Sequence, residues 1–373
     1  MNRERVGKQL GTALLLAALS FFCCFASAAA QTIRDLPPPP PLPTPKPTPT
    51  PAPPKDDDFE VIRVSSNLVM VPVSVVDAKG AAVRGLQPSD FRLEEEGRAQ
   101  QIAEIGNPDE VPLDIAILFD VSSSVSQKGF FAFQQSAAAR FLKQVLKPVD
   151  RAAIFTVGAQ PVLVSPLEPA ETATAKLLTI PAATSSVSTS FYDSVVAAAR
   201  YLEENAPPRH RRVVVVVSDG DDNSSNLLQQ TMTEIRARQK TESTRATDVA
   251  NLQFRHRRAV TEVQKAVQHA DAAFYSINPG GPSIHLNEIS MRAQNGMEAI
   301  AESTGGTAYV PEAEKDLERV FSEVAAELRG QYLVQYYSNS QVPGAQFRRI
   351  SVTLSTHPEL RIRARQGYYP KQK

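Results

Sequence analysis

The chain has 373 residues, of which 42% are hydrophobic, and its 40 basic residues balance its 40 acidic residues. This length predicts roughly two domains. The balanced charge gives no electrostatic case for binding nucleic acid or an anionic membrane, so a partner must be recognised by a specific site.

Residues 1–30 have the three-part pattern of a secretory signal peptide. Basic residues precede the apolar run "GTALLLAALSFFCCFA", and "ASAAAQ" offers small residues for cleavage after Ala28 or Ala30. The apolar run is shorter than the ~20 residues of a spanning helix, which argues against a retained membrane anchor. We therefore predict a secreted or periplasmic protein with no transmembrane span after cleavage. Because Cys23 and Cys24 lie in this segment, the mature chain would have no disulfide.

Residues 31–58 form a proline-rich linker. Twelve of the eighteen residues from Pro37 to Pro54 are proline. Such a composition favours the extended polyproline II conformation and predicts a spacer. The alternative to a spacer is that this stretch binds a partner that recognises proline-rich segments.

The segments on either side of the chain's centre have β character. Residues 59–110 contain the alternating runs "VMVPVSVVD" and "DFRLEEEG", which predict an antiparallel β meander, with Glu94–Glu96 as a solvated strand end. Residues 331–373 contain "QYLVQYYS", "FRRISVTLS" and "LRIRARQGYY". We predict that both segments build one β-sandwich. Arg361, Arg363 and Arg365 share one face of a strand, and they either pair with the acidic run or are solvated.

Residues 111–330 change to an α/β pattern. Runs that are apolar on both faces, such as "LDIAILFD" and "RVVVVVSDGDD", alternate with amphipathic helical segments. This pattern predicts a doubly wound, mainly parallel sheet of the Rossmann-like type, inserted in the β-sandwich. In such sheets ligands bind beyond the carboxyl ends of the strands.

Three segments place oxygen-bearing side chains at this edge. "DVSSS" follows one apolar strand, "STSFYD" precedes a helix, and "VSDGDD" follows the valine strand. Two carboxylates and three hydroxyls are hard oxygen ligands that leave positions for water or a visiting carboxylate, an arrangement that Mg2+ prefers, with Mn2+ or Ca2+ as alternatives. The candidate metal ligands are Asp120, Ser122, Ser124, Thr189 and Asp219.

These motifs resemble the von Willebrand factor A (VWFA) domain. Together with "NLVMVPVSVVDAKGAAVRGLQPSDFRL", "GGTAYV" and "RIRARQGYYP", they are similar to a bacterial secreted family of VWFA-related proteins known chiefly from acidobacteria. The resemblance implies a metal-ion-dependent adhesion site (MIDAS). In it Ser122 and Ser124 would bind the metal directly, and Thr189 would bind it in the ligand-competent state. Asp120 and Asp219 would bind it directly or through water, and a protein partner would add an Asp or Glu.

Each motif has an alternative interpretation. "DVSSS" could cap a helix, Ser188 and Ser190 compete with Thr189, and Asp221 and Asp222 fit a solvated turn or a supporting role beside the metal ligands. The chain has no G-x-S-x-G elbow and no phosphate-binding loop, and its five histidines lack the spacing of metal ligands. We therefore expect that the protein is not an enzyme. The competing function is a scaffold with a vestigial metal site that acts through the β-sandwich or an insertion. A hydrolase is the third alternative.

That insertion covers about residues 226–257. It is polar, rich in Arg and Gln, and free of Gly and Pro, which favours a helix. Because it leaves the edge that carries Asp219, it either gates or widens the binding face, or it is a tolerated surface insertion.

Overall fold

The computed structural model describes residues 68–122, 131–184, 187–231, 234, 245–281, 288–340 and 346–370. All of them lie in one structural unit, Val64–Lys373. The predicted signal peptide and proline-rich linker lie outside the described residues. Among the described residues, no helix combines the length and apolar character that a membrane-spanning segment needs.

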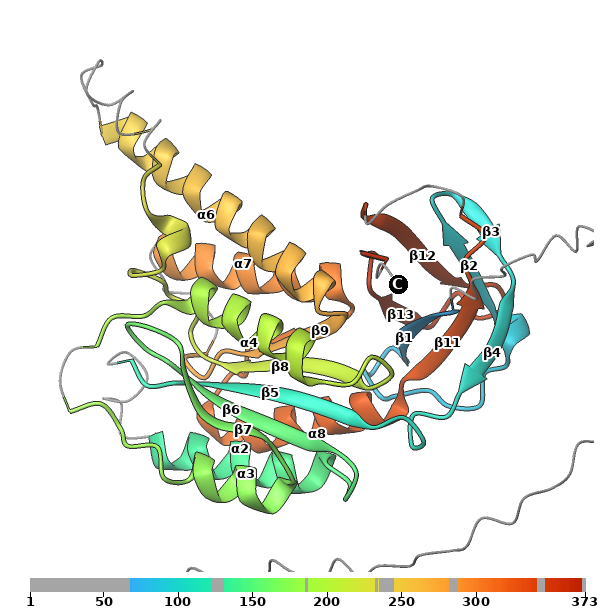
Figure 1. Cartoon of the computed structure of the whole chain (residues 1–373), viewed down its shortest axis with the longest axis horizontal. Coiled ribbons are helices and arrows are strands. Elements are labelled where there is room, and N and C mark those ends of the chain that lie inside the picture. The colour runs from blue at the N-terminus through green and yellow to red at the C-terminus, as the bar shows by residue number, and fades with distance from the viewer. Residues whose placement is uncertain are drawn as a thin grey trace, which may run out of the picture. The chain divides into compact units, whose positions relative to one another are not determined.

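The centre of the α/β domain is a sheet of six strands (Figure 1). They are β5 (Leu113–Asp120), β6 (Arg151–Val157), β7 (Val162–Glu168), β8 (Arg211–Val217), β9 (Ala272–Ile277) and β10 (Ala308–Tyr309). The order is β10-β9-β8-β5-β6-β7, and only the pair β6 and β7 is antiparallel. The mainly parallel sheet is therefore confirmed.

Helices cover both faces of this sheet. They are α2 (Phe131–Val145), α3 (Ala170–Leu177), α4 (Phe191–Asn205), α6 (Arg245–His269), α7 (Glu288–Thr304) and α8 (Leu317–Gly330). Helices α2, α3 and α8 lie on one face, and α4, α6 and α7 lie on the other (Figure 1). Ile117 of β5 packs in the first layer and Leu118 in the second, so the central strands are apolar on both sides.

The β-sandwich consists of two sheets of four strands each. The strands are β1 (Leu68–Val76), β2 (Phe91–Glu95), β3 (Arg98–Gln100), β4 (Ile102–Gly106), β11 (Tyr332–Tyr337), β12 (Arg348–Leu354), β13 (Arg361–Ala364) and β14 (Gly367–Tyr368). The orders are β13-β1-β11-β4 and β14-β12-β2-β3, so each sheet combines N-terminal and C-terminal strands, as predicted. The prediction that residues 59–110 form an antiparallel meander is wrong in detail, because β1 and β4 belong to one sheet whereas β2 and β3 belong to the other.

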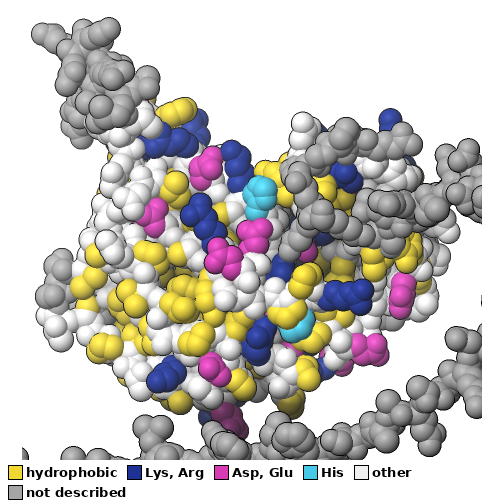
Figure 2. Space-filling model, in the orientation of Figure 1, with side chains coloured by type: hydrophobic (Ala, Val, Ile, Leu, Met, Phe, Trp, Pro, Cys, Tyr) yellow, Lys and Arg dark blue, Asp and Glu magenta, His cyan; other side chains and the backbone are white. Residues whose placement is uncertain are grey.

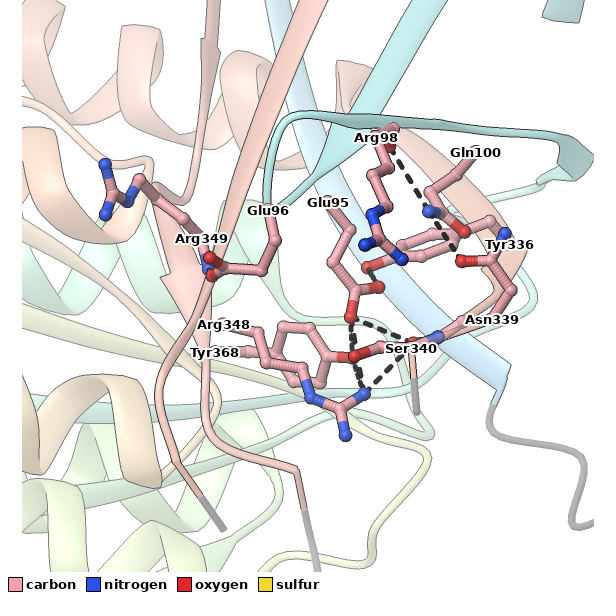
Figure 3. Close-up of polar contacts among 11 residues, drawn as sticks. Glu95, Glu96, Arg98, Gln100, Tyr336, Asn339, Ser340, Arg348, Arg349 and Tyr368 are labelled. Carbon is pink, nitrogen blue, oxygen red and sulfur yellow. Dashed lines mark hydrogen bonds and ion pairs between the residues drawn. The ribbon is translucent and has the colours of Figure 1, made fainter. Parts of the chain in front are cut away.

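Glu95 lies in the core of the β-sandwich and is only 2% exposed, which corrects the interpretation of residues 94–96 as a solvated strand end. Its carboxylate accepts a hydrogen bond from the hydroxyl group of Tyr336 at 2.9 Å (Figure 3). It accepts a second one from the hydroxyl group of Ser338, also at 2.9 Å. Arg348 completes the cluster with an ion pair at 3.3 Å. Phe91, Leu93 and Glu95 alternate on one face of β2, and that face is buried.

The arginines of the C-terminal strand neither pair with residues 94–96 nor remain solvated as a group. Arg363 forms an ion pair with Glu327 of α8 at 2.8 Å, and Arg365 forms one with Asp271, which precedes β9. Both acidic partners belong to the α/β domain. These basic residues therefore join the β-sandwich to the α/β domain.

Gly305 permits a close backbone contact between the two domains. Its φ is +82°, and a Cβ atom there would lie 2.6 Å from the backbone nitrogen of Arg365. A side chain would thus collide with the backbone between β13 and β14. The "GGTAYV" motif therefore has a packing role at this junction.

Candidate functional site

Asp120 ends β5 with a carboxylate that has no solvent exposure. Its Oδ1 accepts a hydrogen bond from the backbone amide of Ser122 at 2.7 Å, and its Oδ2 accepts one from the hydroxyl of Ser218, which follows β8. Residues that follow two neighbouring parallel strands, β5 and β8, therefore orient this carboxylate.

The environment of Asp120 opposes its negative charge. Burial, together with the negative charge of Asp219, raises the pKa of Asp120 to about 7, although the hydrogen bonds from Ser122 and Ser218 act in the opposite direction. Among the described residues, no Lys or Arg forms a recorded ion pair with Asp120 or Asp219. A cation beside these carboxylates would stabilise both in their charged form.

Asp219 stands on a tight turn directly after Ser218. Its Oδ1 accepts the backbone amide of Asp221 at 3.2 Å. The next residue, Gly220, has φ +76°, and a Cβ atom there would lie 2.8 Å from the side chain of Met297 in α7. Glycine therefore allows the "SDG" turn to pack against α7 while Asp219 stays half-buried.

Thr189 lies two residues before the start of α4, next to the N-cap residue Ser190, and is buried. Its amide donates to Oδ1 of Asn223 at 2.9 Å, and its carbonyl accepts the amide of Asn223 at 3.0 Å. These bonds fix Thr189 against the loop that carries Asp219. The competitor Ser190 is engaged elsewhere, because its hydroxyl donates to the carbonyl of Gly158 at 2.8 Å.

Asp222 caps α4, so its placement on a solvated turn is wrong. Its carboxylate accepts the amide of Tyr192 at 2.8 Å and both the amide and the hydroxyl of Ser225, at 2.9 and 2.6 Å. A carboxylate at a helix N-terminus satisfies free amides and interacts favourably with the helix dipole. Burial nevertheless raises the pKa of Asp222 above its ordinary value. Asp222 thereby attaches the loop to the helix that follows Thr189.

Two further contacts hold the same loop where it enters the short 3-10 helix η2 (Asn226–Leu228). Asp193 of α4 accepts the backbone amide of Asn226 at 2.7 Å. Arg258 of α6 donates to the carbonyls of Leu227 and Gln229, at 3.1 and 3.0 Å. The helix that carries the end of the insertion therefore contacts the loop after Asp219. The predicted helicity is confirmed for residues 245–257, whereas residues 232–233 and 235–244 lie outside the described part.

Residues 115–221, which contain Asp120, Thr189 and Asp219, match the family model of the von Willebrand factor type A domain. The α/β domain is a von Willebrand factor type A domain. A search of the curated proteins found no match.

Solved structures with similarity to the chain include three different kinds of protein. Human COPII-coat protein Sec24c is 11% identical with a TM-score of 0.41, and the match covers 70% of this chain and 44% of that chain. The von Willebrand factor domain of the type V pili tip protein Mfa5 from Porphyromonas gingivalis is 13% identical with a TM-score of 0.40, covering 58% and 94%. Mussel byssus proximal thread matrix protein 1, with a zinc-occupied MIDAS motif, is 12% identical with a TM-score of 0.42, covering 64% and 50%. The chain thus spans less than half of Sec24c.

The structure brings together the segments that carry the candidate ligands of the von Willebrand factor type A domain. Ser218 links the loop after β8 to Asp120, and Asn223 links that loop to Thr189. Ser124 lies outside the described residues. Within the described part, no three His, Cys, Asp or Glu side chains cluster, so a site there must rely on hydroxyl oxygens beside its two carboxylates.

Sequence reasoning missed Ser218 and Asn223. Ser218 shares the "VSDGDD" motif with Asp219, but nothing in the pattern shows that its hydroxyl reaches the neighbouring strand. Asn223 stands in a polar loop whose register against Thr189 depends on the fold. Ser218 and Asn223 are not among the predicted metal ligands, but each forms a hydrogen bond to one of them.

Proposed function

We propose that the von Willebrand factor type A domain binds a protein partner through a divalent cation, Mg2+ in the first instance. The proposed ligands are Asp120, Ser122, Ser124, Thr189 and Asp219. When bound, Mg2+ would supply an open coordination position for a carboxylate oxygen of the partner's Asp or Glu.

The observation that carries the proposal is the buried carboxylate of Asp120. Burial of a charged group is costly unless a partner compensates it, and a second carboxylate nearby increases that cost. Both oxygens of Asp120 are nevertheless held in place by Ser122 and Ser218. A carboxylate held in this way beside Asp219, at the carboxyl edge of a parallel sheet, suits a cation site.

The supporting contacts keep the donor set in place before a metal arrives. Asn223 fixes the backbone of Thr189, and Asp222 ties the loop to α4. Partners that orient metal ligands typically contribute about 10–100-fold to metal affinity. The loop segment from Asp219 to Asn223 is therefore part of the proposed site.

The experiment that tests the proposal measures Mn2+ binding by electron paramagnetic resonance, because the signal of free Mn2+ reports the concentration of the unbound ion. We expect the metal-stripped full chain to bind Mn2+ and to release it to excess Mg2+. Thr189→Ala and Ser122→Ala should weaken binding, whereas Ser355→Ala, an exposed residue of the β-sandwich, should leave it unchanged. Equal binding by wild type and both site variants would refute the donor set.

A folded wild-type protein that binds neither ion would favour the alternative function, a scaffold with a vestigial site. The proposal assigns no catalytic role to these residues. Secretion to the periplasm or beyond, and the division into residues 59–110, 111–330 and 331–373, stay predictions from the sequence.

A further inference from the structure

A groove of about 940 Å³ lies on the other side of the α/β domain from Asp120. It is lined by the residues at the start of β8 and β9, which mark the amino edge of the parallel sheet. The opposite wall is the face of β1 and β11 that points away from the sandwich core. The groove is therefore separate from the proposed metal site.

The sandwich wall of the groove presents apolar side chains to solvent. Leu68 of β1 and Tyr337 of β11 are direct neighbours across the strand pair, and they are 47% and 56% exposed. Tyr369 also lines the groove and stacks on His269 of α6, with ring centroids 3.6 Å apart. Exposed apolar side chains gathered in a groove indicate a contact surface for another molecule.

The wall from the α/β domain is basic. Arg209 is exposed on the turn that precedes β8. Arg211 and Arg212 are buried, and their recorded hydrogen bonds go to backbone carbonyls rather than to carboxylates. Figure 2 shows hydrophobic, basic, acidic and histidine side chains where the α/β domain meets the β-sandwich.

Acidic groups do not offset this charge within the groove. Asp271 is the only carboxylate among the described lining residues, and Arg365 pairs with it. Two other basic lining residues, His210 and Arg348, contact acidic residues outside the lining, namely Asp114 and Glu95. The exposed Arg209 and the two buried arginines therefore leave a positive excess, which favours an anionic occupant.

We propose that this groove binds an extended acidic peptide segment of a protein partner. Apolar side chains of the segment would lie on Leu68 and Tyr337, and its carboxylates would face Arg209. Tyrosine and arginine are among the residue types that contribute most to protein interfaces, because they combine apolar area with directional polar contacts. The inference does not depend on the metal site.

The test is a fluorescence anisotropy titration of the full chain with a labelled decapeptide of alternating Glu and Leu. All samples contain EDTA, so the outcome is independent of the proposed metal function. We expect saturable binding that weakens with added salt, and no binding of the matching Lys and Leu decapeptide. Arg209→Glu and Tyr337→Ala should each weaken binding by about tenfold or more.

The matched control is Arg200→Glu, an exposed arginine of α4 that does not line the groove. It changes the net charge by the same amount as Arg209→Glu and should bind the acidic peptide like the wild type. Thermal unfolding of each variant checks that the fold is retained. Absence of binding by the wild type, or equal losses for Arg209→Glu and Arg200→Glu, would overturn the proposal.

Discussion

Thr189 and Asn223 hold each other through two hydrogen bonds, one in each direction, at 2.9 and 3.0 Å. Asn223→Ala removes the side-chain acceptor and leaves the amide of Thr189 without this partner. We expect the affinity for Mg2+ to fall about tenfold, because Thr189 is then held less firmly. Calorimetric titration measures this loss.

The control for this prediction is Asn226→Ala in the same loop. The Asn226 side chain donates to Asp193 at 2.9 Å and has no recorded bond to Thr189. The affinity of Asn226→Ala for Mg2+ should therefore match that of the wild type. If Asn223→Ala also matched the wild type, Thr189 would not depend on Asn223 for its position.

Gly305→Ala tests the junction between the two domains. The added Cβ would meet the backbone of Arg365 at 2.6 Å, and the positive φ adds strain, so we expect a loss of about 2–5 kcal/mol in the free energy of unfolding. Gly85→Ala is the control, because Gly85 has φ +89° and an added Cβ would have no atom within 4 Å. It should cost only about 1–2 kcal/mol. Equal losses in urea denaturation would show that the junction tolerates a side chain.

Glu95→Leu tests the buried ion pair of the β-sandwich. It leaves the guanidinium of Arg348 buried without its carboxylate, so we expect a loss of about 3–5 kcal/mol. The double variant Glu95→Leu with Arg348→Met should recover much of that loss, because no buried charge remains. Additive losses in urea denaturation would contradict a direct coupling between Glu95 and Arg348.

His256 makes stability depend on pH. Burial, with the positive charges of Arg292 and Arg255, lowers the pKa of His256 to about 4 in the folded protein. The unfolded chain takes up this proton near the ordinary histidine pKa of about 6.5, so protonation favours the unfolded state as the pH falls from about 6.5 to 4.

His256→Phe should therefore lose less stability than the wild type over this pH range, while an aromatic ring still packs beside Tyr192. Unfolding free energies at several pH values, each referred to the same protein at about pH 8, isolate the slope from any constant effect of the substitution. Parallel slopes for the two proteins would show that His256 does not titrate differently on folding.

Apolar patterns predicted the fold well. The run from Leu113 to Asp120 indicated a strand with both faces covered, and its carboxyl end correctly located Asp120 beside the segment after β8. Alternation also predicted that N-terminal and C-terminal strands form one sandwich. These patterns succeed because burial of one or both strand faces dominates strand placement.

Charged side chains were harder to place. Glu95 was assigned to solvent with its acidic neighbours, although alternation with Phe91 and Leu93 could have placed it inside. The partners of Arg363 and Arg365 come from the α/β domain, and no local pattern shows how two domains meet. The same applies to Asn223, whose role depends on loop register.

The most direct test of the proposed metal site is a calorimetric titration of the metal-stripped full chain with Mg2+ in glutarate buffer. Glutarate supplies a carboxylate for the open coordination position. The proposal predicts saturable binding by the wild type and none by Asp120→Asn or Asp219→Asn, both folded as judged by thermal unfolding. No binding by the wild type, or unchanged binding by either variant, would contradict it.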